Sequence, residues 1–354
     1  MRVGDIGEFG LIDRWMNSLR CTDTRCIVGI GDDGAVLQTS PGSVLVATCD
    51  MMVEGIHFKM SFAEPRQIGM KAMAINLSDL AAMNASPLAA LVSVGLNPSL
   101  DVEFVDRLYE GISLMADKYR CPLVGGDTVR SPAAVLVDMF LLGEAPRGDI
   151  TLRSGARPGD LVLVTGSLGS SAAGLDILLL RETRGQGAQS PGVSASVADA
   201  VIRAHLEPTP RLTEAGAIAA AGGATSAIDI SDGLANEVNH IAKMSGVGIT
   251  VDADLVPVSE PAIQVARALG KDPLAYALFG GEDYELCFTA QPSVADRISR
   301  AVLDATGTAV THIGWVSSGS GCWLLREGRR EVLEPAAYDH FRRDAGGGSG
   351  GNQV

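Results

Sequence analysis

The sequence lacks several features by which common classes of protein are recognised. Its six cysteines (Cys21, Cys26, Cys49, Cys121, Cys287 and Cys322) form no CxxC pair and have no metal-ligand spacing, so we interpret them as reduced thiols. The N-terminal residues MRVGDIGEFGLIDRW contain no signal-peptide core, and no apolar run approaches the roughly eighteen residues that cross a membrane. We therefore expect a soluble, cytoplasmic protein that has no membrane partner.

Positive charge is also scarce. The chain carries 28 Lys and Arg against 42 Asp and Glu, which gives a formal net charge of −14. No cluster of basic residues offsets this balance, so a nucleic acid is not an expected partner. If the ligand is nevertheless a phosphate compound, divalent cations rather than basic side chains must mediate most of its binding.

Length and composition predict a folded protein of two domains. The chain has 354 residues, of which 46% are hydrophobic and 20% charged, and this is too long for one ordinary core. Strand-like apolar runs interleave with amphipathic helices, which indicates an α/β or α+β first domain. Pro, Gly and charged residues concentrate at 144–160, so we place the domains at 1–148 and 149–343, followed by a flexible Gly-rich tail at 344–354.

Carboxylates follow two short apolar runs near the N-terminus. Residues 26–30 and 44–47 have the Val and Ile content of buried strands, and Asp33 and Asp50 follow them. Carboxylates at the ends of adjacent strands repel each other unless a cation lies between them. We interpret this stretch as the first half of a magnesium-bridged nucleotide site. A plain polar turn between two strands is the alternative.

Further acidic positions lie at the ends of later predicted elements or within them. Asp79 follows Asn76 by three residues in a predicted helix at 65–83, so both side chains share one side of it. Asp127 follows a Gly pair, and Asp229 and Asp232 follow a strand in TSAIDISDG. Magnesium takes one or two carboxylates plus water and phosphate oxygens, so this many acids suits several ions on a polyphosphate. For Asp79 alone, a paired structural carboxylate is an equal alternative.

A Gly/Ser turn, GSLGSSAAG, follows the predicted strand at 161–165. Backbone amides at the start of a helix can hold a phosphate group. The lysine of a P-loop is absent, however, so we favour an ordinary helix start with small residues.

Six motifs occur in the order found in thiamine-monophosphate kinases: GIGDDGAV, DxxVEGIHF, NLSDLAAM, GGDTxRS, DISDGL and GGEDYEL. The sequence resembles this family from about residue 7 to residue 341. The family belongs to an ATP-binding superfamily that includes aminoimidazole ribonucleotide synthetase and selenophosphate synthetase. VEGIHF together with GGEDYEL is specific to the kinase, whereas GGD is shared across the superfamily.

The resemblance implies ATP-dependent phosphorylation of thiamine monophosphate to the diphosphate. It also implies a homodimer with two α+β domains, in which the N-terminal domains form a barrel-like sheet across the dimer and the C-terminal domain is an α/β sandwich. The accepting phosphate is already largely ionised, because its second pKa is about 6, so no catalytic base or covalent residue is expected. Several Mg²⁺ ions would neutralise and align the two anions.

The resemblance assigns residues to three roles. Matching the family's metal ligands are Asp33, Thr48, Cys49, Asp50, Asp79, Asp127, Asp229 and Asp232. Matching positions that bind ATP are Gly126, Asp127, Arg153 and Ser231. Matching substrate positions are His57, Glu282 and Tyr338, of which Glu282 by its charge and Tyr338 by its ring face suit a thiazolium cation.

One position departs from the family pattern. Cys49 stands where many members have a hydroxyl residue, and a thiol is a poor ligand for magnesium. If the contact is made by the backbone carbonyl, the change is harmless; if it is made by the side chain, one ion binds more weakly.

Two alternatives to the kinase stay open. One is another ATP-dependent enzyme of the superfamily, such as a purine-pathway synthetase, although such an enzyme is not expected to carry VEGIHF. The other is a catalytically silent nucleotide-binding protein. The set of acids argues against the second, because carboxylates without metal would only repel one another.

Overall fold

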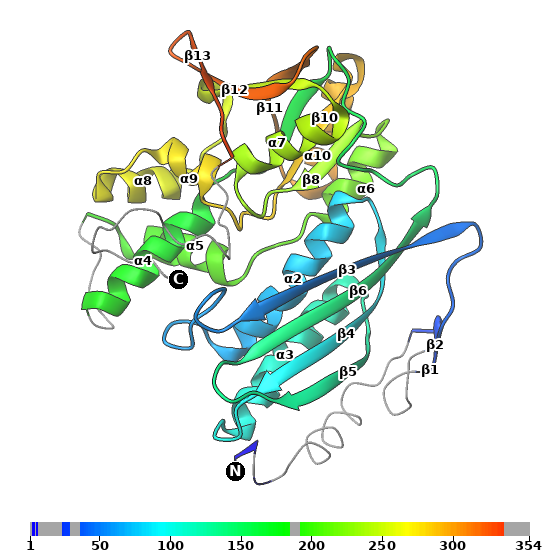
Figure 1. Cartoon of the computed structure of the whole chain (residues 1–354), viewed down its shortest axis with the longest axis vertical. Coiled ribbons are helices and arrows are strands. Elements are labelled where there is room, and N and C mark those ends of the chain that lie inside the picture. The colour runs from blue at the N-terminus through cyan, green and yellow to red at the C-terminus, as the bar shows by residue number, and fades with distance from the viewer. Residues whose placement is uncertain (1, 4, 6–22, 29–35, 185–191, 336–354) are drawn as a thin grey trace. The chain divides into compact units, whose positions relative to one another are not determined.

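The computed structural model of the chain describes residues 2–3, 5, 23–28, 36–184 and 192–335. These residues form two compact units (Figure 1). The first holds the residues up to Leu80 together with Ala85–Gly148, and the second holds Ala81–Asn84 and the described residues from Asp149 onward. In the described ranges, no helix has both the length and the apolar character that crossing a membrane requires. Of the predicted site residues, Asp33 and Tyr338 lie outside these ranges.

The first unit is built on a four-stranded sheet with strand order β3-β6-β4-β5. The strands are β3 (Ser43–Val53), β4 (Ser86–Leu96), β5 (Leu123–Arg130) and β6 (Leu136–Pro146). β6 pairs antiparallel with β3 and β4, whereas β4 and β5 are parallel. Helices α2 (Pro65–Ala82) and α3 (Val102–Tyr119) cover one face, and a separate ribbon pairs β1 (Cys26–Val28) with β2 (Val36–Leu37).

The two helices approach each other at glycines, which fixes the place of α2. A Cβ added at Gly69 of α2 would lie 2.0 Å from the carbonyl oxygen of Leu108, and one added at Gly111 of α3 would lie 2.0 Å from that of Arg66. Each helix therefore presents a glycine to the backbone of the other, and no side chain fits between them. This contact holds the helix that carries Asn76 and Asp79.

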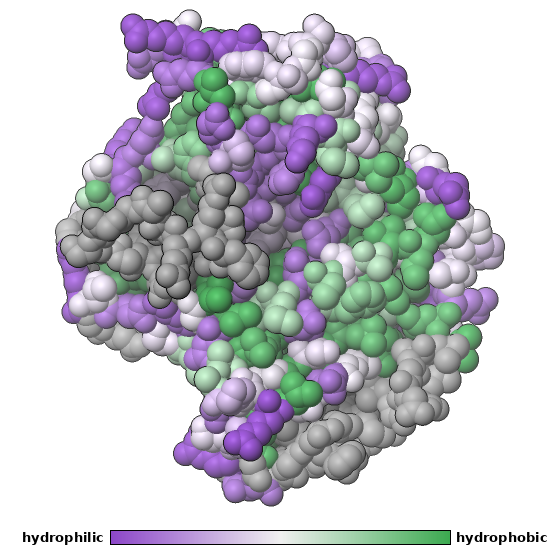
Figure 2. Space-filling model, viewed as in Figure 1, coloured by the Kyte–Doolittle hydropathy of each residue, from purple (hydrophilic) through white to green (hydrophobic). Residues whose placement is uncertain are grey.

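The other face of this sheet exposes several large apolar side chains beside polar ones such as Asp138. Along β3, buried Val46 and Met52 alternate with Leu45 and Met51, which are 52% and 49% exposed. Phe140 of β6 is 41% exposed. Figure 2 shows hydrophobic surface over this sheet. A sheet with one face in solvent normally alternates apolar and polar residues along each strand. The uncovered apolar side chains therefore indicate that another protein surface packs against this face.

The second unit is a sheet of seven strands between two layers of helices. Its strand order is β13-β12-β9-β11-β7-β10-β8, and β12 with β9 is its parallel pair. The strands are β7 (Leu161–Thr165), β8 (Ser226–Asp229), β9 (Gly248–Asp252), β10 (Leu286–Ala290), β11 (Val310–Ser317), β12 (Gly321–Arg326) and β13 (Arg329–Val332). The expected α+β content is confirmed in both units.

Helices pack on both faces of that sheet. One core joins it to α7 (Leu234–Ser245) and α9 (Pro273–Phe279), and a second core joins it to α6 (Leu212–Ala220) and α10 (Pro292–Thr306). A third cluster packs α4 (Ser170–Arg184), α5 (Ala195–Leu206) and α8 (Glu260–Leu269) beside α9. The short 3-10 helix η1 (Ala253–Leu255) follows β9.

Two expectations about the acidic positions are wrong. Strand β3 continues to Val53, so Asp50 lies within the strand rather than after it. The first predicted strand pairs with β2 in its own ribbon, so β1 and β3 are not neighbours in one sheet. Strand β3 forms eleven residue pairs with β6 and so continues past Asp50. Cross-strand pairing here outweighs the local preference of a polar residue for a turn.

Helix α4 continues to Arg184, and β13 forms the edge of the seven-stranded sheet beside β12. Neither larger sheet closes into a barrel in the described part of a single chain.

Candidate functional site

In the first unit, the structure brings together polar residues of β3 and α2. The backbone N–H of Asp50 donates to Asn76 Oδ1 at 3.0 Å, and the Thr48 hydroxyl donates to Asp79 Oδ2. Thr48 and Asp50 alternate with buried Val46 and Met52, so they share the sheet face that α2 covers. The prediction that Asn76 and Asp79 share one side of a helix is confirmed by these contacts.

The side chain of Asn76 links β3 to α2. It is fully buried, and its Nδ2 donates to the carbonyl of Ala72 at 3.1 Å, which orients the amide toward β3. The carboxylate of Asp50 is exposed and that of Asp79 is partly exposed. Two carboxylates and a hydroxyl therefore lie at one open place, and all of them are oxygen donors that suit a hard cation.

Cys49 faces away from this group. Its Sγ lies 3.3 Å from Asp138 Oδ1 of β6, on the opposite face of the sheet from Thr48 and Asp50. Burial, followed by the hydrogen bond with Asp138, raises the pKa of the thiol. The thiol is therefore both turned away and kept protonated, which leaves the side chain unsuited to join Thr48 and Asp50 on a cation.

Asp127 and Gly126 lie in β5, at the far edge of the same sheet. The register aligns Asp127 with Ser93 of β4, which in turn aligns with Asp138 of β6. Three strand spacings separate β5 from β3, which is about 14 Å. Within the first unit, the structure therefore does not bring Asp127 to Asp50. Its role as a ligand stays a prediction.

His57 lies in a tight turn directly after β3. The backbone N–H of Val53 donates to His57 Nδ1 at 3.0 Å, and the backbone N–H of His57 donates to the carbonyl oxygen of Val53 at 2.9 Å. Because Nδ1 accepts a hydrogen bond, the proton of the neutral ring is on Nε2. The turn thus fixes both the tautomer and the direction of the ring.

In the second unit, the two loops DISDG and GGEDYEL are joined through their backbones. The N–H of Glu282 donates to the carbonyl of Ser231 at 2.7 Å, and Ile230 and Tyr284 are paired at 2.9 Å. Gly281 has φ +68, and a Cβ there would lie 2.5 Å from the carbonyl oxygen of Ser231. The predicted ATP residue Ser231 and the predicted substrate residue Glu282 are therefore direct backbone neighbours.

The acids of the DISDG loop surround a buried glutamate that the sequence analysis missed. Asp229 is the last residue of β8 and is 3% exposed, whereas Asp232 is exposed. Glu237, at 2% exposed, accepts the N–H of Asp232 at 3.0 Å. Burial, followed by the charges of Asp229 and Asp232, raises the pKa of Glu237 to about 8, although the hydrogen bond from the Asp232 N–H and the charge of Arg153 oppose this. Arg153 therefore lies within electrostatic range of this loop.

The Glu282 side chain is held by a buried histidine. Its Oε2 lies 3.1 Å from His205 Nδ1, and the same nitrogen lies 3.0 Å from Ser171 Oγ. His205 is 2% exposed and belongs to α5. Glu282 itself adopts φ +56, a conformation that non-glycine residues rarely hold and that clusters at functional sites. A lone histidine in a predicted helix gave no signal of this contact.

The start of α4 resolves the question left open by its Gly/Ser turn. The N–H of Gly169 donates to Asp283 Oδ2 at 2.8 Å, and that of Ser171 lies 3.5 Å from Oδ1. Burial raises the pKa of Asp283 to about 7, and the two backbone contacts oppose this. A carboxylate of the protein therefore occupies the amides that a phosphate would need, in agreement with the ordinary helix start.

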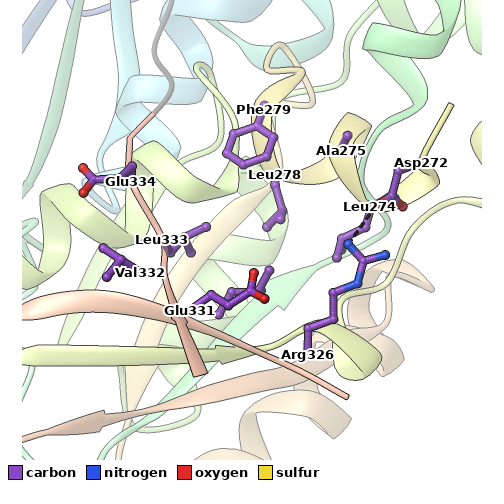
Figure 3. Close-up of a pocket in the computed structure, with 11 residues that line it drawn as sticks. Asp272, Leu274, Ala275, Leu278, Phe279, Arg326, Glu331, Val332, Leu333 and Glu334 are labelled. Atoms are coloured by element: carbon purple, nitrogen blue, oxygen red, sulfur yellow. Dashed lines mark hydrogen bonds and ion pairs between the residues drawn. The ribbon is translucent and has the colours of Figure 1, made fainter. Parts of the chain in front are cut away.

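A separate cavity of about 320 Å³ lies along α9, between this helix and β12 and β13 (Figure 3). Leu278 points into it and Phe279 lies at one end. At the other end, Arg326 and Asp272 form an ion pair at 2.9 Å. None of the predicted site residues lines this cavity.

The predicted site residues thus fall into two sets, one in each unit. The first unit unites Thr48, Asp50 and Asp79, and the second unites Ser231 with Glu282 and places Arg153, Asp229 and Asp232 around Glu237. In the part of the chain that the structure describes, no group of three or more His, Cys, Asp or Glu side chains is close enough to hold a metal ion.

Comparison with known proteins identifies the class to which this fold and these acidic loops belong. Residues 31–145 match the N-terminal domain of AIR synthase related protein, and residues 157–322 match its C-terminal domain. The hydrogenase maturation protein HypE of E. coli also shares the fold, with a TM-score of 0.73 over 94% of this chain and 98% of that one at 22% identity.

More similar proteins narrow the class. Thiamine-monophosphate kinase of Escherichia coli O157:H7 is 37% identical over 95% of this chain and 98% of its own length, and that of Aquifex aeolicus is 36% identical over 96% and 100%. A crystal structure of the Stenotrophomonas maltophilia kinase has a TM-score of 0.79 at 33% identity, covering 92% and 98% of the two chains. AaThiL complexed with AMPPCP and TMP has a TM-score of 0.74 at 35% identity, covering 96% and 99%. The chain belongs to the thiamine-monophosphate kinase family and is a phosphotransferase.

Proposed function

We propose that the protein transfers a phosphoryl group from ATP to thiamine monophosphate and forms thiamine diphosphate. Thiamine-monophosphate kinases of two bacteria match nearly the whole chain, and one solved relative holds an ATP analogue together with TMP. The observation that supports the proposal most is the backbone pairing of Ser231 with Glu282, because the motifs imply a contact with ATP for the first and with the acceptor for the second.

The side chains fit magnesium as the accompanying ion. Asp50, Asp79 and Thr48 in the first unit, and Asp229 and Asp232 in the second, are all oxygen donors, and the thiol of Cys49 is turned away from them. Bound magnesium would offset the charge of the two phosphate groups. Asp33 and Asp127 complete the proposed ligand set.

The remaining residues orient the two substrates. Arg153 has a forked set of donors that suits a phosphate of the nucleotide, and Gly126 and Ser231 contribute contacts to ATP. Glu282, held by His205, faces the cationic acceptor, with His57 and Tyr338 as its other contacts. No residue needs to remove a proton, since the acceptor phosphate is already ionised at neutral pH.

We also propose a homodimer formed through the first unit. Its sheet presents Leu45, Met51 and Phe140 on a face that α2 and α3 leave uncovered. Pairing two such faces would bury this apolar surface and give the barrel-like sheet that the motifs imply. Sedimentation at micromolar concentration tests this; a monomer would contradict it, and Phe140→Glu is expected to weaken the dimer.

The activity is tested by mixing purified protein with ATP, Mg²⁺ and thiamine monophosphate and separating the products by chromatography. The expected result is thiamine diphosphate and ADP in equal amounts. Phosphorylation of free thiamine in preference to the monophosphate would show that the acceptor is wrong. ADP release with no phosphorylated product would point to another reaction of the superfamily.

A further inference from the structure

Glu237 is a buried acid to which the proposed reaction assigns no role. It lies on the second turn of α7 and is 2% exposed, on the same helix as the buried apolar residues Leu234, Val238 and Ile241. Burying an ionisable side chain among apolar ones costs free energy, and a leucine at this position would avoid that cost. The acid is therefore better explained by what it contacts than by packing.

The side chain of Glu237 contacts the loop that precedes its own helix. Its Oε1 accepts the N–H of Asp232 at 3.0 Å, five positions earlier in the chain. Between them, Gly233 stands at the start of α7 and has no side chain with which to cap the helix. Glu237 thus binds the backbone of the residue before the helix, and so fixes how the DISDG loop enters α7.

The neighbouring residues of this loop are also held in place. Gly233 adopts φ +98, and a Cβ there would lie 2.7 Å from the carbonyl oxygen of Leu278 near the end of α9. On the other side, the carbonyl of Ser231 accepts the N–H of Glu282 at 2.7 Å. Three consecutive residues therefore have defined backbone positions, and at Asp232 this is achieved by a side chain.

Two carboxylates of the loop lie within electrostatic range of Glu237. Asp229 ends β8 and Asp232 follows three positions later, and the charges of both act on Glu237. These two are the residues of the second unit that we propose bind magnesium. Magnesium takes one or two carboxylates together with water and phosphate oxygens, and it demands near-octahedral geometry. The direction of each carboxylate therefore decides how well an ion binds.

We propose that Glu237 is a positioning residue for this cation site: by holding the N–H of Asp232, it directs the carboxylates of the DISDG loop toward the ions that accompany the nucleotide. The inference rests on the proposed function and extends it to a residue that the motifs assign to no ligand. Replacing a residue that orients metal ligands typically weakens metal binding about 10–100-fold. A plain helix cap would instead affect stability alone.

Two uncharged variants separate the hydrogen bond from the charge. Glu237→Gln keeps the length of the side chain and an oxygen that can accept the N–H of Asp232. Glu237→Met keeps the length but has only a thioether sulfur, which is a weak acceptor. Glu214→Met is the matched control, because Glu214 is also a buried glutamate on a helix of the second unit, where it accepts the Thr308 hydroxyl at 2.8 Å.

Calorimetry measures the binding of the nonhydrolysable analogue AMPPCP at a series of Mg²⁺ concentrations, and urea midpoints are measured without Mg²⁺. We expect Glu237→Met to bind Mg²⁺ with the analogue at least about tenfold more weakly, and Glu237→Gln to stay within about threefold of the unaltered protein. Glu214→Met should lower the urea midpoint, since a buried hydrogen bond is lost, and leave Mg²⁺-dependent binding within about twofold.

Equal loss of binding in both Glu237 variants would overturn the proposal, because the charge rather than the hydrogen bond would then be responsible. Unaltered binding in Glu237→Met, with or without a lower urea midpoint, would leave only a helix cap and overturn it as well. If Glu237→Met does not fold, Glu237→Leu provides the comparison without an acceptor, under the same criteria.

Failure of the proposed function gives a different result. The unaltered protein would then form no thiamine diphosphate or would bind AMPPCP without any dependence on Mg²⁺, and the role of Glu237 would fall with it. If the unaltered protein forms the diphosphate and binds the analogue with Mg²⁺, the function stands, and the two Glu237 variants alone decide the positioning role.

Discussion

The two units position their polar residues in different ways. In the first, regular elements do so: β3 presents Thr48 and Asp50, α2 presents Asn76 and Asp79, and side chains make the contacts. In the second, two loops are paired through their backbones, and Gly281 and Glu282 hold left-handed conformations. In the first unit, replacing a polar side chain should therefore lower activity with little effect on folding. In the second unit, a substitution that alters the backbone conformation of one loop should displace the residues of both loops.

The largest effect is expected from Asp50→Asn in the first unit. The contact with Asn76 uses the backbone N–H of Asp50, so the variant should fold while losing an oxygen that we propose binds magnesium. Activity should fall by at least about a thousandfold, as when a group that stabilises developing charge is removed. Asp138→Asn, on the opposite face of the same sheet, is the matched control and should stay active. An active Asp50→Asn enzyme with unaltered Mg²⁺ dependence would move the site elsewhere.

Next in size is Gly281→Ala in the second unit. A Cβ at this position would lie 2.5 Å from the carbonyl of Ser231, and φ is +68. Gly270 has a similar φ of +69 but nothing within 4 Å, so Gly270→Ala measures the conformational cost alone, about 1–2 kcal/mol. We expect Gly281→Ala to lower the free energy of unfolding by more than this and to raise KM for both substrates. Equal urea midpoints for the two variants would show that the loops are not tightly paired.

A smaller effect is expected in the pH dependence of stability. The pKa of Asp283 is raised to about 7 from 3.8, so the folded state holds this proton more tightly than the unfolded chain. The stability that follows is fully present below about pH 4 and is lost as pH rises through about 7. The slope from this one group is at most about 1.4 kcal/mol per pH unit.

Asp283→Asn should make that slope shallower without removing it, because the pKa of Glu237 is raised to about 8 and acts in the same direction. Urea unfolding at pH 5, 6, 7 and 8 in the absence of Mg²⁺ measures the slope for both proteins. Identical slopes for variant and parent would mean that Asp283 titrates normally.

The smallest effect is expected from Cys49→Thr. The thiol contacts Asp138 and faces away from Thr48 and Asp50, so restoring the hydroxyl residue of the family should leave activity equal or raise it slightly. Activity measured over a range of Mg²⁺ concentrations tests this. A large loss would mean that the thiol contributes to the site.

The contrast between the units also explains what the sequence could predict. Helical spacing correctly placed Asn76 and Asp79 on one side of α2, because a regular element carries its side chains at fixed angles. The end of β3 was misplaced, since pairing with β6 extends the strand past Asp50. The spacing of apolar residues within one segment does not show which strand will pair with it.

Residues held by distant contacts escaped the sequence analysis for a similar reason. His205 reaches Glu282 across 77 positions of the chain, and nothing near it in sequence signals the contact. Glu237 did leave a signal, because it is an acid among the apolar positions Leu234, Val238 and Ile241 of α7. A buried acid on an apolar helix face requires a partner, and here that partner is the backbone of Asp232.

A crystal structure of the protein with a nonhydrolysable ATP analogue, Mg²⁺ and thiamine monophosphate would show whether the proposed carboxylates hold the ions. We expect carboxylate oxygens of Asp50 and Asp79 to lie about 2.1 Å from ions that also touch nucleotide phosphates, and the acceptor cation to lie against Glu282. Nucleotide and acceptor bound with these carboxylates in contact with no ion would contradict it.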